Sequence, residues 1–353
     1  GGGAKCLVLC DTNGGRLPLE IQEGVRTVMA EIDLQIGIHA HNDCELGVAG
    51  TIAAIEAGAV MVQGTVNGLG ERTGNANLTS IIPVIDLKMA ERHCVGEEAL
   101  RQLTPVSHFV GEIANMAVPH NLPFAGTSAF AHKGGIHVNA LMKDTRTYEH
   151  IDPQTVGNDR QVLISDLAGR SSLNYKLREF GFEPESIDLT ALLARIKELE
   201  FEGSQLEGAD ASLKLLVREF GEHEADPFEF TGFRIFIDQV SGEFLSEATV
   251  KVSVDGSEEH TAADGNGPVH ALDRAIKKAV SRFFPEVERI RLTDYKVRVL
   301  DAREGTAARV RVLIESTDGD ESWSTVGASH NVIEASWRAI GDSILYKLIF
   351  LAE

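Results

Sequence analysis

Two histidines one residue apart, His39 and His41, follow a short apolar run from Leu34 to Ile38. In a β-strand, residues i and i+2 point to the same side of the sheet. A strand at this place therefore directs both imidazoles toward one point, as a pair of metal ligands requires. The same spacing also occurs in ordinary surface or core histidines, so the motif alone leaves both interpretations open.

Three apolar runs predict buried strands, and two helical stretches separate them. The strands are expected at residues 6–10, 34–38 and 59–63, and the helices at 18–32 and 46–57. This β-α-β-α-β order indicates a parallel sheet covered by helices, as in a (β/α)8 barrel or an open doubly wound sheet. In both architectures, functional residues gather at the carboxyl ends of the strands.

Polar residues follow each of the three predicted strands. They are Asp11-Thr12-Asn13 after the first, residues 39–43 after the second, and a glycine-rich stretch over 64–75 after the third. The first set also suits a simple turn. The glycine-rich stretch lacks both the Lys-Ser/Thr of a P-loop and the G-x-G-x-x-G register, so it is a weak signal for a nucleotide. Three polar strand ends in succession favour one shared site.

Composition narrows the class of protein. The chain has 353 residues, 43% of them hydrophobic, and a formal net charge of −20. This charge argues against a nucleic-acid partner, which needs a basic surface. No apolar run reaches membrane-spanning length and no signal peptide is visible, so no membrane partner is expected. Four cysteines without a C-x-x-C pair indicate reduced thiols and a cytoplasmic protein.

Several motifs together resemble the acyl-CoA Claisen-condensing synthases, which comprise the 2-isopropylmalate, homocitrate and citramalate synthases. The strand-end motifs Cys10–Gly14, Gly37–Asp43 and Asn67–Asn77 resemble the last three barrel strands of that family. Residues 129–137, 147–153 and 169–172 look most like its citramalate branch. The resemblance extends from Cys6 to Leu348 and implies the C-terminal part of a (β/α)8 TIM barrel, a mostly helical linker region and an α+β regulatory domain.

The resemblance implies a set of site residues. His39 and His41 are expected to hold a divalent metal ion (Zn, Mn, Mg or Co), with Asn75 as a further ligand or a supporting residue. Thr12 is expected to bind the carboxylate of a 2-oxoacid. His137 and Tyr148 match the linker residues that act in catalysis, while His132 and His150 are alternatives. Without the resemblance, His137 is interpreted as a structural histidine and Tyr148 as a packing residue.

Three loop residues near the metal motif have supporting roles in this interpretation. Glu71 and Arg72 are expected to form an ion pair that braces their loop. Asp43 is expected either to orient a ligand imidazole or to cap the following helix.

The implied reaction joins acetyl-CoA to pyruvate and gives (R)-citramalate, a step of isoleucine biosynthesis. The alternatives are 2-isopropylmalate synthase, which acts in leucine biosynthesis, and a non-catalytic fragment that senses an amino acid. The family opens with a strand ending in an Arg-Asp pair, which this sequence lacks. About five strand-helix units are therefore expected to be absent, and the chain alone is not expected to turn over substrate.

Three domains are expected. Residues 1–118 form part of the TIM-barrel catalytic domain, 119–226 the linker subdomains, and 227–353 the allosteric and dimerisation domain. In the last domain two β-β-β-α units repeat at a constant offset, which aligns Thr261 with Thr325 and Ala271 with Ala335. The resemblance implies a homodimer that binds a branched-chain amino acid, with isoleucine favoured, at residues that the sequence does not identify. Helix starts near Gly267 and Asn331 suit a ligand carboxylate or simple capping.

Overall fold

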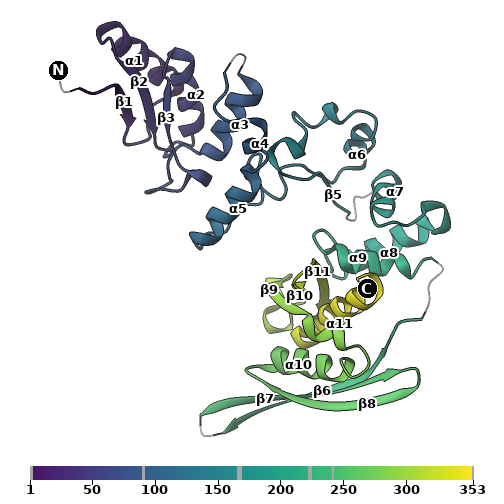
Figure 1. Ribbon diagram of the computed structural model, residues 1–353. Coiled ribbons are helices and arrows are strands. Elements are labelled where there is room, and N and C mark those ends of the chain that lie inside the picture. The colour runs from purple at the N-terminus through teal and green to yellow at the C-terminus, as the bar shows by residue number, and fades with distance from the viewer. Residues whose placement is uncertain (1–2, 90–91, 165–168, 222–224, 241, 352–353) are drawn as a thin grey trace. The chain divides into compact units, whose positions relative to one another are not determined.

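The structure is a computed structural model that describes residues 3–89, 92–164, 169–221, 225–240 and 242–351 (Figure 1). The chain divides into two compact units. Unit 1 comprises Gly1–His132 and Ala140–Gln161, and unit 2 comprises Lys133–Asn139 and Val162–Glu353.

Unit 1 begins with a three-stranded parallel sheet in the order β1-β2-β3. Its strands are β1 (Cys6–Asp11), β2 (Gln35–Ala40) and β3 (Met61–Gln63). The helices of this part are α1 (Pro18–Glu31), α2 (Gly47–Ala57), α3 (Leu78–Lys88), α4 (Glu97–Leu100) and α5 (Leu103–Ile113). The predicted alternation of strands and helices is thus confirmed, although β2 continues two residues beyond Ile38.

The middle strand is the most deeply buried of the three. Ile36 and Ile38 of β2 pack with Ile21 and Val25 of α1 and with Ala54 of α2. Ile36, Gly37 and Ile38 are all buried, although they alternate between the two faces of the sheet. A strand covered on both faces shows a nearly continuous apolar run, which is why its pattern was readable from the sequence.

The remainder of unit 1 is irregular and contains short elements. They are η1 (Val66–Gly68), β4 (Ala131–His132), η2 (Thr145–Thr147), η3 (Pro153–Val156) and β5 (Gln161–Val162). Phe124, Phe130 and Val156 pack with Leu100 and Leu103 to form a separate small core. This core fixes the segment around Tyr148 and His150.

Unit 2 contains three helices that share one apolar core, ahead of its sheets. The helices are α7 (Arg170–Glu179), α8 (Leu189–Phe201) and α9 (Asp210–Arg218), and the short α6 (Gly135–Leu141) and η4 (Pro184–Ser186) also lie in this region. Leu173, Leu192, Ile196 and Leu213 are among the fully buried core residues. The predicted helical character of residues 119–226 is confirmed over α7, α8 and α9, whereas the described residues from 119 to 164 contain only short elements.

The order strand-strand-strand-helix then occurs twice, in two antiparallel sheets. The first set is β6 (Glu229–Val240), β7 (Glu243–Val254), β8 (Ser257–Gly265) and α10 (Pro268–Val280). The second is β9 (Arg291–Val299), β10 (Val310–Thr317), β11 (Ser322–Ser329) and α11 (Val332–Phe350), with η5 (Pro285–Arg289) and η6 (Ala302–Ala307) as connections.

Small residues allow the two long helices to approach their sheets closely. Ala271 and Ala275 of α10, and Ala335 and Ala339 of α11, are completely buried. A Cβ at Gly327 would lie 2.1 Å from the Ala335 carbonyl oxygen, so only glycine fits where β11 meets α11. The spacing of alanines seen in the sequence therefore marks the helix faces that contact the sheets.

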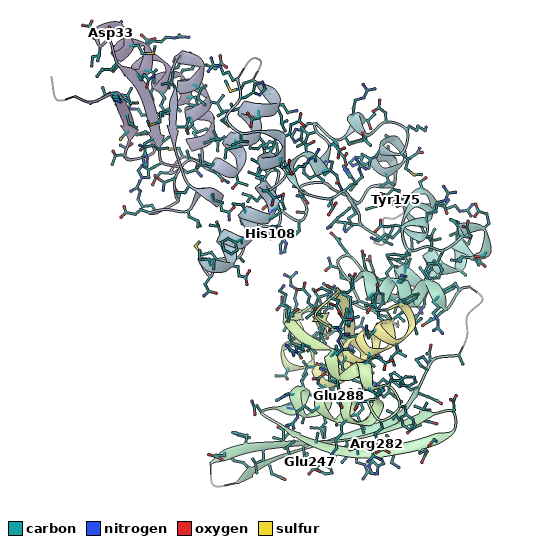
Figure 2. The ribbon with its side chains drawn as sticks, in the orientation of Figure 1. Asp33, His108, Tyr175, Glu247, Arg282 and Glu288 are labelled. Atoms are coloured by element: carbon teal, nitrogen blue, oxygen red, sulfur yellow. The ribbon has the colours of Figure 1, made fainter. Side chains whose placement is uncertain are left out.

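The outer surface of the C-terminal sheets and helices carries charges of both signs. Glu247, Arg282 and Glu288 are exposed there (Figure 2). Within the described ranges, no helix combines the length and the apolar character that crossing a membrane requires.

A partly buried carboxyl group links α9 to α11. Asp342 accepts a 2.6 Å hydrogen bond from the Ser212 hydroxyl, which itself accepts the backbone N–H of Val326. The pKa of Asp342 is raised to about 7, chiefly because burial disfavours the carboxylate, with a smaller contribution from Glu219; the hydrogen bond from Ser212 and the charge of Arg338 oppose the rise.

Asp342 should make unit 2 less stable at high pH. Because the pKa is raised in the folded state, that state holds a proton which the unfolded chain has already released above about pH 4. Stability should fall by on the order of 3 kcal/mol between about pH 4 and pH 7, and then level off. Asp342→Asn should remove this slope and stabilise the protein at pH 8, as measured by urea unfolding at pH 5 and pH 8. An unchanged slope in the variant would show that Asp342 is ionised in the folded protein.

Candidate metal and substrate site

His39 and His41 lie at the carboxyl end of β2. His39 is in the strand, where its backbone lies beside that of Cys10 in β1, and His41 follows the last strand residue. Their rings are adjacent, with centroids 5.0 Å apart and an interplanar angle of 68°. The structure thus brings the two imidazoles together, as the i, i+2 spacing predicts.

The orientation of the His41 ring is set by the backbone of the neighbouring strand. Its Nδ1 lies 3.0 Å from the Asp11 carbonyl oxygen, and its backbone N–H donates to the same oxygen at 3.3 Å. Since a carbonyl only accepts, Nδ1 carries the proton and Nε2 keeps its lone pair. A backbone carbonyl that fixes the tautomer in this way is a common arrangement behind metal-binding histidines. Asp43, expected as a possible orienting group, binds Arg72 with both carboxylate oxygens.

Asn75 lies next to His41 and has an unsatisfied oxygen. The backbones of these two residues form an isolated antiparallel bridge. The Asn75 Nδ2 donates to the Leu69 carbonyl at 2.9 Å, whereas its Oδ1 is buried without a hydrogen-bond partner. A buried acceptor without a donor costs roughly 1–3 kcal/mol unless an ion or water satisfies it. Two imidazoles beside such an oxygen suit a divalent cation.

The protein ligand set is small. Among the side chains described by the structure, no group of three or more His, Cys, Asp or Glu residues is arranged to hold a metal ion. The predicted ligands His39, His41 and Asn75 offer two nitrogens and one amide oxygen as donor atoms. This mixed set leaves coordination positions for substrate oxygens.

Arg72 connects the loops that follow all three strands. Its guanidinium donates to both carboxylate oxygens of Asp43, at 2.7 and 3.0 Å, and to the Thr12 carbonyl at 2.9 Å. The hydrogen bonds from Arg72 lower the pKa of Asp43. Glu71, the predicted partner of Arg72, lies 3.9 Å from it and its side chain is 88% exposed. The main partner of Arg72 in the structure is therefore Asp43.

Gly14 makes this arrangement of loops possible. It has a φ of +65°, and a Cβ at this position would lie 2.4 Å from the Asp43 Oδ2. A side chain here would displace the carboxylate that Arg72 binds. The glycine after Asp11-Thr12-Asn13 is therefore required by the close approach of the Asp43 loop as well as by the turn.

The remaining predicted site residues are Tyr148, His137 and Thr12. Tyr148 follows η2 in unit 1, and its side chain contacts the His132 ring with centroids 6.5 Å apart. His137 is an exposed residue of α6 and belongs to unit 2. Thr12 joins the cluster through its backbone carbonyl. Four of the six predicted residues are therefore grouped at the strand ends, Tyr148 lies elsewhere in unit 1, and His137 belongs to unit 2.

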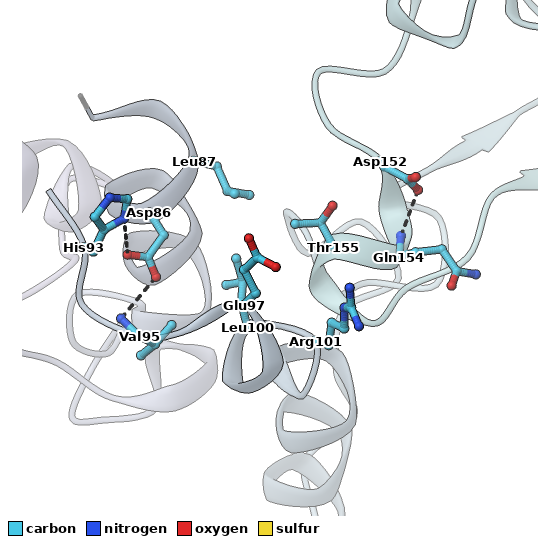
Figure 3. Close-up of a pocket in the computed structure, with 10 residues that line it drawn as sticks. All are labelled: Asp86, Leu87, His93, Val95, Glu97, Leu100, Arg101, Asp152, Gln154 and Thr155. Carbon is cyan, nitrogen blue, oxygen red and sulfur yellow. Dashed lines mark hydrogen bonds and ion pairs between the residues drawn. The ribbon is translucent and has the colours of Figure 1, made fainter. Parts of the chain in front are cut away.

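A separate cleft of about 590 Å³ lies beside α3 and α4 (Figure 3). Its lining includes Asp86, His93, Glu97, Arg101 and Asp152. Asp86 accepts the backbone N–H groups of Cys94 and Val95, so its carboxylate already has structural partners. The cleft contains none of the predicted site residues.

The C-terminal helices differ at their first turns. The Asn331 side chain caps α11 by accepting the Ile333 N–H, so simple capping explains that helix start. Gly267 precedes α10 and provides no side-chain cap.

Three family models match successive parts of the chain. The model described as HMGL-like matches residues 2–110, the homocitrate synthase post-HMGL domain-like model matches 124–204, and the LeuA allosteric (dimerisation) domain matches 207–348. A mixed α/β architecture with a TIM-barrel type of domain and a dimerisation domain is thereby established.

A relative from Aquifex aeolicus, named (R)-citramalate synthase, is 54% identical over 99% of this chain and 67% of its own length. The chain belongs to the (R)-citramalate synthase family. A citramalate synthase from Geobacter sulfurreducens is 51% identical, with 98% of this chain and 66% of that protein covered. A probable 2-isopropylmalate synthase from Methanopyrus kandleri is 32% identical, with 96% of this chain and 66% of that protein covered.

The chain spans about two thirds of the length of the curated citramalate synthases it matches. Among solved structures, an HMG-CoA lyase from Bacillus subtilis shares 22% identity over 33% of this chain and 40% of its own, with a TM-score of 0.30. A score this low adds nothing to the assignment, which depends on the sequence relatives.

Proposed function

We propose that the whole protein is an (R)-citramalate synthase that condenses acetyl-CoA with pyruvate. The observation that carries this proposal is the cluster of His39, His41 and Asn75 at the strand ends of a chain 54% identical to such an enzyme. The difference between 54% and 32% identity favours the citramalate branch over 2-isopropylmalate synthase. Soluble substrates of this kind fit a cytoplasmic enzyme.

We propose that His39, His41 and Asn75 hold a divalent metal ion. The Nε2 of His41 keeps a lone pair because Nδ1 donates to the Asp11 carbonyl, and the Asn75 Oδ1 has no hydrogen-bond partner among the described residues. When bound, the ion supplies Lewis-acid polarisation of the 2-oxoacid's ketone. The donor set suits Zn, Mn, Mg or Co, and competition among these ions in solution distinguishes them.

We propose one contact with the substrate and two chemical steps that follow it. The Thr12 hydroxyl donates a hydrogen bond to the pyruvate carboxylate, because Arg72 binds the Thr12 backbone and fixes its place. A base removes a proton from the acetyl methyl group, and the new C–C bond joins that carbon to C2 of pyruvate. Water then hydrolyses the thioester and releases CoA. His137 and Tyr148 are candidates for these proton transfers.

We propose that the C-terminal domain forms the homodimer and binds a branched-chain amino acid. This part of the chain matches the LeuA allosteric (dimerisation) domain model. The hairpin of β6 and β7 carries exposed apolar side chains, namely Phe236, Ile237, Phe244 and Leu245. We propose further that β6–α10 and β9–α11 are two copies of one repeat. Pairing of such exposed strands between two copies of the chain would cover the apolar hairpin.

Isoleucine should bind this chain saturably and more tightly than leucine, because the relatives belong to the citramalate branch. Calorimetric titration of each amino acid into the purified chain, with alanine as a control, measures this. A preference for leucine would contradict the choice of effector. Isoleucine binding by a whole protein that forms no citramalate would indicate a sensing protein instead of an enzyme.

Product analysis tests the proposed reaction. The whole protein is incubated with acetyl-CoA and an equimolar mixture of pyruvate and 3-methyl-2-oxobutanoate, and the products are identified by mass spectrometry. Citramalate should exceed 2-isopropylmalate by at least about tenfold, since a pocket for pyruvate has no room for the branched chain. A majority of 2-isopropylmalate would overturn the assignment.

A further inference from the structure

The amine of Lys214 lies among aromatic rings in unit 2. This lysine belongs to α9, and its Nζ lies 4.3 Å from the centroid of the Phe350 ring, 5.8 Å from that of Tyr346 and 6.0 Å from that of Phe180. Tyr346 and Phe350 belong to α11, and Phe180 follows the last residue of α7. Three helices therefore surround one amine with apolar surface.

Lys214 differs from the other lysines of the described ranges in what surrounds its amine. The others either bind a carboxylate or a backbone carbonyl, as Lys176 and Lys347 do, or are exposed to water, as Lys251 of β7 is. Lys214 is half-buried, and within the same ranges its Nζ has neither an ion pair nor a hydrogen bond. It is therefore a shielded ammonium without a counter-ion.

The carboxylate best placed to pair with Lys214 along α9 is already bound. Asp210 precedes Lys214 at the i, i+4 spacing that favours such a pair. It accepts instead from the Lys176 Nζ at 2.7 Å, and that lysine also binds Glu179 at 2.8 Å. The Tyr346 phenol stays uncharged at neutral pH, because burial and the charge of Asp210 raise its pKa. No anion thus compensates the charge of Lys214.

An amine in these surroundings loses its proton more readily than one in water. Burial lowers the pKa of Lys214, because the rings replace only part of the hydration that the ammonium gives up. A desolvated lysine in a hydrophobic pocket is an activated nucleophile. Acylation of Lys214 also removes a charge without breaking an ion pair, whereas acylation of Lys176 breaks two.

We propose that Lys214 is a modification site that accepts the acyl group of an acyl thioester such as acetyl-CoA. The free amine attacks the thioester carbonyl, a C–N bond forms and the C–S bond breaks. CoA leaves as a thiolate and takes up the proton that the nitrogen loses, so no further reagent is needed. The product places an uncharged amide and a methyl group against the rings. This inference goes beyond the proposed condensation and does not depend on it.

Peptide mass spectrometry of the purified chain, incubated with acetyl-CoA at pH 8 without pyruvate or metal, tests the proposal. Lys214 should be acetylated at least about threefold faster than Lys251, because a lower pKa raises the fraction of free amine more than it weakens the nucleophile. Lys251 is the matched control in the same sample, since it is exposed and belongs to the same unit. Acetylation of Lys214 that is no faster than that of Lys251 would overturn the proposal.

Lys176→Met tests whether the missing counter-ion is the cause. This variant frees Asp210 to pair with Lys214, so acetylation of Lys214 should slow to about the rate of Lys251. Lys277→Met, which frees Asp273 on α10, should leave the rate at Lys214 unchanged. A folded Lys176→Met that keeps the fast rate would refute the explanation; if it does not fold, the comparison within the wild type decides. Neither measurement involves citramalate, so failure of this proposal and failure of the proposed function are separate results.

Discussion

His41→Ala is expected to lower the affinity of the chain for Zn²⁺ or Mn²⁺ by at least about 100-fold. This substitution removes the imidazole whose tautomer the Asp11 carbonyl fixes, and it leaves Asn75 and His39 as an incomplete ligand set. Even groups that only support a ligand change metal affinity by about 10–100-fold, so loss of the ligand itself should have a larger effect. Calorimetric titration of each metal into chelator-treated chain measures the change.

The matched control for this experiment is His93→Ala. The His93 side chain is 77% exposed and lies in the cleft beside α3, away from the strand-end cluster. This control should bind metal as the wild type does, and His39→Ala should behave like His41→Ala. Equal affinity in wild type and His41→Ala would show that the metal binds elsewhere or does not bind.

Lys347→Ala is expected to destabilise unit 2 by about 3–5 kcal/mol, the usual cost of leaving a buried charge without its partner. Lys347 donates to the Asp318 carboxylate at 2.7 Å and to the Leu351 carbonyl at 2.9 Å. Both side chains of the pair are almost fully buried, with 6% and 3% exposed. The hydrogen bond from Lys347 lowers the pKa of Asp318, aided by the backbone N–H groups of Glu321 and Asp320. Urea unfolding at pH 7 measures the loss.

Two further variants show whether the buried charge is the cause. The double variant Lys347→Met with Asp318→Asn removes both charges and should recover most of the stability. Arg282→Ala breaks the 2.8 Å pair with Glu259 at an arginine that is 66% exposed, and it should cost no more than about 1 kcal/mol. If Lys347→Ala were as mild as Arg282→Ala, the ion pair would be open to water in solution.

Much of the fold was predictable because local signals agreed with it. The β-α-β-α-β order was visible since β2 is buried on both faces and α1 carries one apolar stripe, with Ile21 and Val25 as its buried members. The i, i+2 spacing alone placed His39 beside His41. The constant offset that aligns Ala271 with Ala335 indicated two similar units, and both alanines are completely buried. The first two of these features depend on residues close together in the chain.

The contacts that hold the site together were not predictable in the same way. Arg72 binds Asp43 and Thr12, which are 29 and 60 residues away, and the neighbouring Glu71 offered a more obvious partner. Arg160 and His132 meet at Glu149 across segments without regular periodicity. A sequence pattern reports which face of an element is buried, whereas such pairs depend on how loops from different elements come together. The run of charged and polar residues around Tyr148 was the available signal for the contacts of Glu149.

The most direct test of the central claim is citramalate formation by the whole protein after chelation and metal return. The wild type should lose pyruvate-dependent release of CoA from acetyl-CoA when chelated, and recover it with a divalent ion. His41→Ala should remain inactive after the same metal is added, while His93→Ala should recover. Full activity in chelated wild type, or recovery of His41→Ala at stoichiometric metal, would contradict a metal-dependent synthase that uses the strand-end histidines.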